Sequence, residues 1–195
     1  RHEVRAECGV NSHIHIMTIM IGRGDIYSDD HVTLSGDGAR FDADAAYLGK
    51  NSQTIDYNIV ADHFGKKTES LITVNGALTD SAKKVFRGTI DFKKGSADSV
   101  GSENETVLML GDDVVNKTVP LILCAEENVE GTHGATIGEL DADTMFYFES
   151  RGIDRETAEK IMAYAAVERL IHMAEDSEFA AVAEKAMGIK TDTEE

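Results

Sequence analysis

The alternation of short β-prone segments with glycine turns most limits what this chain can fold into. Through about residue 140, segments rich in Val, Ile, Thr and Phe alternate with glycine or Asx turns, and no helical pattern intervenes. Many short strands without helices predict a sandwich, a barrel or a solenoid, and no exact repeat or hexapeptide signature separates the three. The predicted strands are 13–21, 31–34, 40–48, 54–63, 69–74, 84–92, 105–110, 118–125 and 132–137.

The side-chain pattern within these segments indicates which faces are buried. In the segment 54–60, Ile55, Tyr57 and Ile59 alternate with polar residues, as expected for a strand with one buried face. The segment 13–21 is apolar on both faces, which predicts a strand covered on both sides.

The pattern changes to helices near Leu140. Asp141 and Asp154 are placed to cap two successive helices, and Gly152 ends the first. Ser177 starts a third helix, for which the i, i+3, i+4, i+7 rule predicts one buried face. That face comprises Phe179, Val182, Ala183 and Ala186.

Three parts follow from this division. Residues 1–139 are predicted to form a β domain, residues 140–189 a helical domain, and residues 190–195 a polar, disordered tail.

Charge and composition exclude several partner classes. The formal net charge of −17 disfavours binding to nucleic acid or to an anionic membrane, because phosphates are repelled. No apolar run approaches the ~20 residues of a membrane span, and no signal peptide is recognised. Two cysteines are too few for a disulfide framework, so we expect a cytoplasmic protein.

Two groups of residues are candidates for metal binding. His13 and His15 share one face of a strand, and Cys8 lies close enough in sequence to add a thiolate. Because the same face carries apolar residues, a structural role is favoured for both histidines. Cys124 follows an apolar run and is interpreted as a small buried hydrophobic residue.

Catalytic motifs are not recognised in the sequence. Gly65-Lys66-Lys67-Thr68 lacks the first glycine of a P-loop and its terminal Ser or Thr. Paired acids such as Asp112-Asp113 suit solvated turns, because neighbouring strand residues point to opposite faces and make a poor acid–base couple. There is also no nucleophile elbow. We therefore expect no enzyme activity.

The densest signal surrounds His133, which lies between two glycines at the end of the β region. Its elements are His133-Gly134-Ala135-Thr136, then Gly138-Glu139-Leu140-Asp141, then Met145-Phe146-Tyr147-Phe148-Glu149-Ser150-Arg151-Gly152-Ile153, with Val85-Phe86-Arg87-Gly88-Thr89-Ile90 upstream. This series closely resembles the signature of the SufB/SufD family of the SUF iron–sulfur cluster assembly system. The resemblance runs from about residue 49 to about residue 165.

The resemblance implies a fold and a set of partners. The family fold is a right-handed parallel β-helix followed by a C-terminal α-helical domain. Its members pair SufB with SufD through the β-helix ends, and each helical domain docks an ABC-type ATPase, SufC. Family members are considerably longer, which implies that the β-helix is truncated at its N-terminus.

The resemblance also implies site residues. His133 corresponds to the interface histidine of SufD, a candidate ligand for a transient cluster shared with the partner. Asn104 and Thr132 are further interface candidates. The SufB cysteine position falls at Glu105, and Gly134 replaces the glutamate of SufB, so the chain is nearer SufD. The aromatic residues Phe146, Tyr147 and Phe148, with Arg151, are candidates for docking the ATPase, and packing against the β-helix is an equal alternative.

We therefore expect a non-catalytic scaffold subunit for iron–sulfur cluster assembly. It would pair with a SufB-like subunit and a SufC-like ATPase, or form a homodimer through its β-helix end, and would bind no cluster alone, since clusters commonly require four thiolates. The alternatives are a β-helical polysaccharide lyase or hydrolase and a self-associating structural solenoid.

Overall fold

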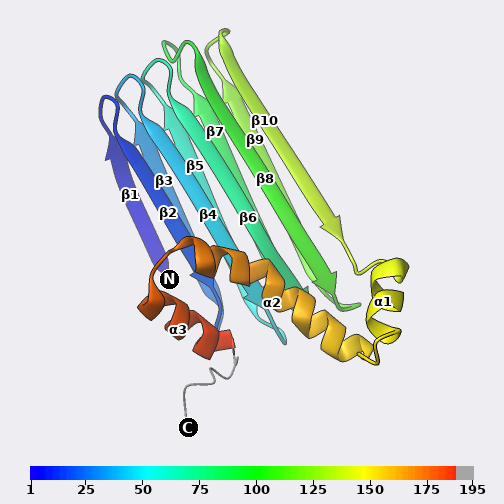
Figure 1. The fold of residues 1–195 in the computed structure, drawn as a ribbon. Helices are drawn as coiled ribbons and strands as arrows, with labels where there is room; N and C mark the ends of the chain where they lie inside the picture. The colour runs from blue at the N-terminus through cyan, green and yellow to red at the C-terminus, as the bar shows by residue number, and fades with distance from the viewer. Residues whose placement is uncertain (188–195) are drawn as a thin grey trace.

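A computed structural model describes residues 1–187, and these residues form a parallel β-helix followed by three helices (Figure 1). The predicted tail, 190–195, lies outside the described residues. Each coil contributes one strand to each of two five-stranded parallel sheets, β1-β3-β5-β7-β9 and β2-β4-β6-β8-β10. The strands are β1 (His2–Cys8), β2 (His13–Met20), β3 (Ile26–Leu34), β4 (Arg40–Gly49), β5 (Thr54–His63), β6 (Glu69–Thr79), β7 (Lys83–Phe92), β8 (Ser99–Leu110), β9 (Val115–Cys124) and β10 (Val129–Gly138). The predicted parallel β-helix is confirmed.

The repeat is hidden in the sequence because the coils differ in length. Ile26 pairs with Ile55 and Ile55 with Lys84, so each of these coils takes 29 residues (55 − 26 and 84 − 55). Lys84 then pairs with Asn116, which makes the next coil 32 residues long (116 − 84). The extra residues lie in the turns, where a solenoid tolerates them without a shift in the strand register.

One turn position recurs in the first four coils and marks the repeat. Asn11, Gly38, Lys67 and Asp98 all have positive φ, at 52°, 69°, 55° and 63°. Each donates its backbone N–H to a carbonyl of the next coil, as Lys67 does to Ala97 at 2.9 Å. Residues with left-handed backbone therefore form a row along one side of the solenoid, from coil to coil, and only one of the four is glycine.

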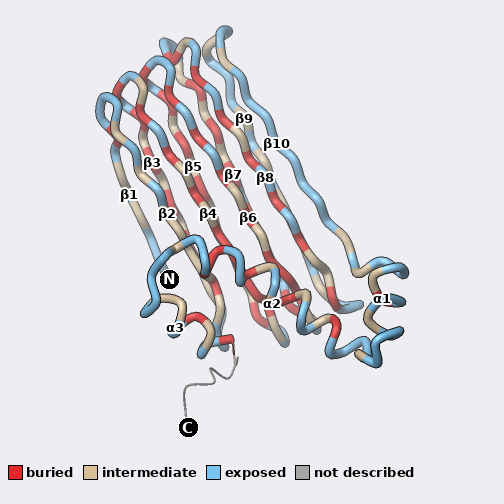
Figure 2. Tube along the Cα trace, viewed as in Figure 1, coloured by how far each residue is buried: buried red, intermediate tan, exposed pale blue. Residues whose placement is uncertain are grey.

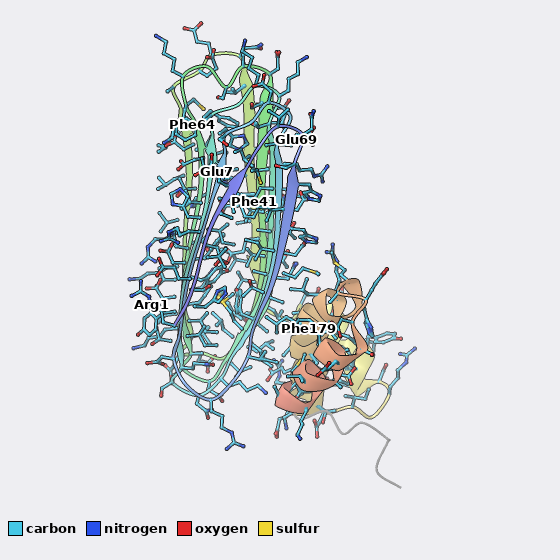
Figure 3. The ribbon with its side chains drawn as sticks, turned by 90° about the vertical axis from the view of Figure 1, so that its left-hand side faces the viewer. Arg1, Glu7, Phe41, Phe64, Glu69 and Phe179 are labelled. Carbon is cyan, nitrogen blue, oxygen red and sulfur yellow. The ribbon has the colours of Figure 1, made fainter. Side chains whose placement is uncertain are left out.

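The main core fills the space between the two sheets. Inward-facing residues such as Phe41, Tyr57, Ile72 and Phe86 are fully buried there. Figure 3 views the sheets from the side, with Phe41 between them. Burial of one face of the strands from β3 to β8 is what the alternating segments predicted.

The helices cover part of one sheet only (Figures 1 and 3). Helix α2 (Arg155–Met173) packs Ala163, Val167 and Leu170 against the outer face of the even-numbered sheet, where Leu48 and Ala77 meet it. This leaves the other half of β2 uncovered, so His13 and His15 are exposed, and the prediction of a strand covered on both sides is wrong there.

The two predicted helix caps are confirmed. The Asp141 carboxylate accepts the backbone N–H of Thr144 at the start of α1 (Ala142–Glu149), and Asp154 accepts that of Thr157 in α2. Gly152, with φ of 76°, ends the α1 turn as predicted.

Helix α3 (Ser177–Met187) buries a different face from the predicted one. It buries Ala183 and Met187, whereas Val182 is 66% exposed and Ala186 is also exposed. The Tyr164 hydroxyl donates to the Met187 carbonyl at 2.9 Å and helps set this orientation. No helix in the described part of the chain is long and apolar enough to cross a membrane.

Candidate functional site at the open end of the β-helix

The fifth coil is one of two open ends of the solenoid, since β1 and β2 of the first coil also keep a free edge each within residues 1–187. Within residues 1–187, β9 pairs only with β7 and β10 only with β8, so each keeps one free edge. The burial-coloured trace shows β10 exposed along most of its length (Figure 2). Free edges offer unpaired backbone donors and acceptors for another strand.

His133 stands on this open end and faces the interior of the solenoid. Strand alternation places it on the same side as Val129 and Gly131. A Cβ on Gly131 would lie 2.7 Å from Ile122, which shows that this side of β10 faces the core. His133 is nevertheless exposed, because no described coil lies beyond it. The imidazole is therefore accessible from the end of the solenoid.

Glu103 lies directly beneath His133. The two residues are register partners on the adjacent parallel strands β8 and β10. Glu103 is only 2% exposed, and its side chain crosses the core to Gly88, where a Cβ would lie 2.0 Å from the Oε2 atom. Burial, assisted by the nearby charge of Glu105, raises the pKa of Glu103 to about 7. Its Oε2 has no hydrogen-bond partner among the described residues.

A buried ion pair occupies the next inward-facing position of β8. The Lys84 ammonium bonds to the Glu105 carboxylate and to the Thr118 hydroxyl, the latter at 3.0 Å. The Thr118 hydroxyl in turn donates to Glu105 at 2.5 Å. Both charged side chains are essentially inaccessible to solvent. Burial lowers the pKa of Lys84, and the carboxylate of Glu105 opposes that shift. This triad joins β7, β8 and β9.

Two of the predicted interface residues lie on the outer face of the same sheet. Thr132 donates to the Ser102 hydroxyl at 3.1 Å, and the Asn104 amide donates to the same oxygen at 3.3 Å. Asn104 is one strand in from the edge. The structure therefore does not bring Asn104 and Thr132 together with the His133 imidazole, which projects from the opposite face of β10.

The predicted aromatic docking residues are mostly exposed. Phe146 and Tyr147 on α1 are 71% and 54% exposed, and Phe148 is half-buried. The Arg151 guanidinium lies 3.6 Å from the centroid of the Tyr147 ring. Met145 is the buried residue of α1, so the helix is anchored by one side chain and presents two aromatic rings outward.

The two histidines near the N-terminus engage carboxylates of the next coil. His13 hydrogen-bonds Asp42 at 2.9 Å and His15 hydrogen-bonds Asp44 at 2.8 Å. Cys8 is buried, and burial raises the pKa of its thiol, so it does not join them. Within residues 1–187, no group of three or more His, Cys, Asp or Glu residues is arranged to hold a metal.

The interpretation of Cys124 as a buried residue is wrong. It is exposed, since it is the last residue of the edge strand β9 and no further described coil covers it.

Sequence reasoning missed the charged interior beneath His133. A signal was available: Glu103 and Glu105 alternate in phase with the buried Val107, and Lys84 alternates in phase with the buried Phe86. Charged residues that alternate in step with the buried residues of a strand point into the core, and they therefore predict a buried polar cluster.

The fold and this end of it define a class: a parallel β-solenoid that carries helices on one sheet and exposes a histidine on its last described coil. The sequence matches the family described as "SUF system FeS cluster assembly, SufBD core domain" over residues 2–166. The chain belongs to this SufB/SufD family.

Several curated relatives carry the same family name. The chain is 31% identical to "Iron-sulfur cluster assembly protein SufD" of Bacillus subtilis over 145 residues, which is 74% of the chain and 33% of that protein. It is 30% identical to the SufD of Escherichia coli over 88 residues, 45% of the chain and 21% of the relative. A chloroplastic SufBD family protein of Arabidopsis thaliana is 26% identical over 159 residues, 82% of the chain and 28% of the relative. The chain spans about a third of the length of these relatives or less.

Proposed function

We propose that this chain is a non-catalytic scaffold subunit of iron–sulfur cluster assembly. It presents its open coil to a SufB-like subunit and its helices to a SufC-like ATPase. The observation that carries the proposal is the open fifth coil with an accessible histidine, in a chain of the SufB/SufD family. The names of the relatives add support, because they describe iron–sulfur cluster assembly proteins.

The partner surface consists of the free edges of β9 and β10. A strand added to such an edge gains backbone hydrogen bonds, and exposed side chains next to the edge supply specificity. On the outer face of β9, Val119, Leu121 and Leu123 are each more than 40% exposed. They form a row of exposed hydrophobic side chains, which is typical of an interaction surface. A SufB-like coil end docked here covers the edges and this row together.

The cluster is a transient cargo held between two subunits. Iron–sulfur clusters are held mainly by thiolates, with histidine as an occasional ligand. Cys8 is buried within the first coil, far along the solenoid from β10, so in this proposal the ligands of this chain come from the fifth coil, where His133 is exposed on β10 and Cys124 at the end of β9. The remaining ligands come from the SufB-like partner.

The ATPase docks on the helical segment in this proposal. Phe146 and Tyr147 supply exposed aromatic surface, and Arg151, stacked on Tyr147, adds a positive charge. Aromatic and arginine side chains are frequent centres of protein interfaces. Docking at α1 links the ATPase to the open end, because α1 follows β10 directly in the chain.

Anaerobic co-purification with the SufB-type and SufC-type proteins of the same organism tests the proposal. We expect a stable complex whose iron and sulfide content falls in His133→Ala, while its subunit composition is unchanged. His172→Ala, a replacement of an exposed histidine on α2, is the matched control and should leave the iron content unchanged. If neither protein binds a full-length version of the chain, the scaffold function is wrong, and association of the chain with itself becomes the better account.

A further inference from the structure

Two histidines on the outer face of β2 lie outside the site described above. The sequence favoured a structural role for His13 and His15 because the same strand face carries apolar residues. The structure separates the two halves of that face. Met17 and Ile19 pack against the core beneath the helices, whereas the side chains of His13 and His15 are 50% and 33% exposed. The apolar neighbours therefore give no reason to assign the two imidazoles to the interior.

Each of these histidines is paired with a carboxylate of the next coil. The Nε2 atom of His13 lies 2.9 Å from Asp42, and that of His15 lies 2.8 Å from Asp44. Asp42 is also the register partner of His15, so it is bonded to one histidine and lies opposite the other. The two rings are nearly parallel, with centroids 6.4 Å apart. Two imidazoles and two carboxylates are thus collected on one exposed patch of the even-numbered sheet.

We propose that this patch, formed by His13, His15, Asp42 and Asp44, binds one divalent transition-metal ion such as Zn²⁺. Two imidazole nitrogens and two carboxylate oxygens are a donor set that Zn²⁺ accepts in tetrahedral geometry, at about 2.0–2.2 Å. Ligand atoms at these distances lie about 3.3 Å from one another, so each His–Asp pair opens by only about 0.5 Å to share an ion. Each ring proton then moves from Nε2 to Nδ1. The two carboxylates balance the charge of the ion.

Binding requires a local rearrangement of exposed side chains. Within residues 1–187 the four donors form two separate pairs and are not already gathered round one point. The two imidazoles must turn toward each other, which their exposure permits. Arg40 opposes the ion, because its Nε atom lies 3.2 and 3.0 Å from the two oxygens of Asp42. A bound ion joins β2, the edge strand of the first coil, to β4 and so fastens that coil in place.

A similar histidine pair on the other sheet lacks these features and is the matched control. His31 hydrogen-bonds Asp62 at 2.6 Å. No histidine stands two positions from His31 in the sequence, and the Lys93 ammonium already lies 3.2 Å from Asp62. This pair offers one imidazole and a carboxylate that a cation has engaged, so His31→Ala should not change the affinity for the ion.

Calorimetric titration of the chain with Zn²⁺ tests the site, in a Cys124→Ser background that removes the exposed thiol. We expect one ion per chain. Loss of even an outer-shell partner commonly weakens metal binding 10–100-fold, so His13→Ala, His15→Ala and Asp42→Asn should each weaken it by at least about 10-fold. Arg40→Gln should tighten it. Urea unfolding shows that each variant has folded, and the visible absorption of bound Co²⁺ reports whether coordination is tetrahedral.

Several results would overturn the proposed metal site. These are no binding of Zn²⁺, an unchanged affinity in folded His13→Ala or His15→Ala, or a loss of affinity in His31→Ala. Binding that disappears in His133→Ala instead would place the ion at the open end of the fifth coil. Weaker binding in Arg40→Gln would contradict the role of Asp42 as a ligand. The metal site does not depend on the proposed scaffold function, because the chain alone is titrated.

Discussion

Replacing Lys84 with methionine is expected to destabilise the solenoid more than most single substitutions. Lys84 and Glu105 have side-chain exposures of 0% and 1%, so neither charge is solvated by bulk water. Methionine keeps much of the volume of the lysine stem but removes the ammonium. Glu105 then keeps the hydrogen bond from Thr118 and loses its counter-charge.

The size of the effect follows from the cost of an unpaired buried charge. Removing one member of a buried ion pair typically costs about 3–5 kcal/mol, because the remaining charge is left without compensation. Replacing both members with neutral groups of similar volume is often neutral or stabilising. We therefore expect Lys84→Met to lower the free energy of unfolding by about 3–5 kcal/mol, and Lys84→Met with Glu105→Leu to recover most of this loss.

Urea unfolding, followed by circular dichroism at constant pH, measures these differences. The four chains of a double-mutant cycle are the wild type, the two single variants and the double variant. The exposed pair Lys160–Glu156 on α2 is the matched control. Its removal should cost no more than about 0.5 kcal/mol.

Two outcomes would refute this reasoning. If Lys84→Met costs less than about 1 kcal/mol, the pair is not isolated from water as the structure indicates. If the double variant is as unstable as the single variant, the loss comes from packing rather than from an uncompensated charge, and the electrostatic account is wrong.

Three further predictions concern other positions in the solenoid. Burial lowers the pKa of His63 from 6.5 to about 4, so between these pH values only the unfolded chain gains the proton. The wild type should therefore lose up to about 3 kcal/mol of stability as the pH falls from 6.5 to 4. His63→Gln should lack this part of the pH dependence in urea unfolding. Lys67→Gly should raise the free energy of unfolding by about 1 kcal/mol, because Lys67 has a φ of 55°; a loss would show that its side chain matters more than its backbone. Gly88→Ala should lower the thermal midpoint and cost about 1–3 kcal/mol of folding stability, since its Cβ would lie 2.0 Å from Glu103 Oε2. Adding Glu103→Ala should restore the stability of the Gly88→Ala variant, and absence of this rescue would place the strain elsewhere.

Local signals predicted the strands and helices, whereas the choice of a β-helix over a sandwich or a barrel came from the family resemblance. Alternation in 54–60 predicted the buried face of β5, and the capping residues Asp141 and Asp154 predicted where α1 and α2 begin. The coil repeat was not recognised, because coil lengths differ and only the stacked backbone positions, such as Lys67, reveal it. The face of α3 was misassigned, since Tyr164 on another helix helps set it.

Sequence reasoning identified His133 as part of the candidate site but did not identify Glu103. His133 stands between two glycines and carries a family resemblance, so it could be singled out. Glu103 could not, because its significance depends on three strands: β10 carries His133 above it, β7 carries the glycine opposite, and β8 holds it in register. The local pattern, in phase with Val107, indicates that Glu103 is buried, but its neighbours, 15 and 30 positions away in the sequence (103 − 88 and 133 − 103), are set by the fold.

The interior charges also bear on the proposed association at this end of the solenoid. Lys84, Glu103 and Glu105 are buried in the fourth coil, next to the open one, and Thr118 of the edge strand hydrogen-bonds Lys84 and Glu105. Burying charges stabilises a fold poorly, but it imposes geometry, because each group must keep its partner. A strand edge tied to such a cluster is held in one register. A docking partner therefore meets an edge already fixed in place, so less conformational entropy is lost on binding than at a flexible edge.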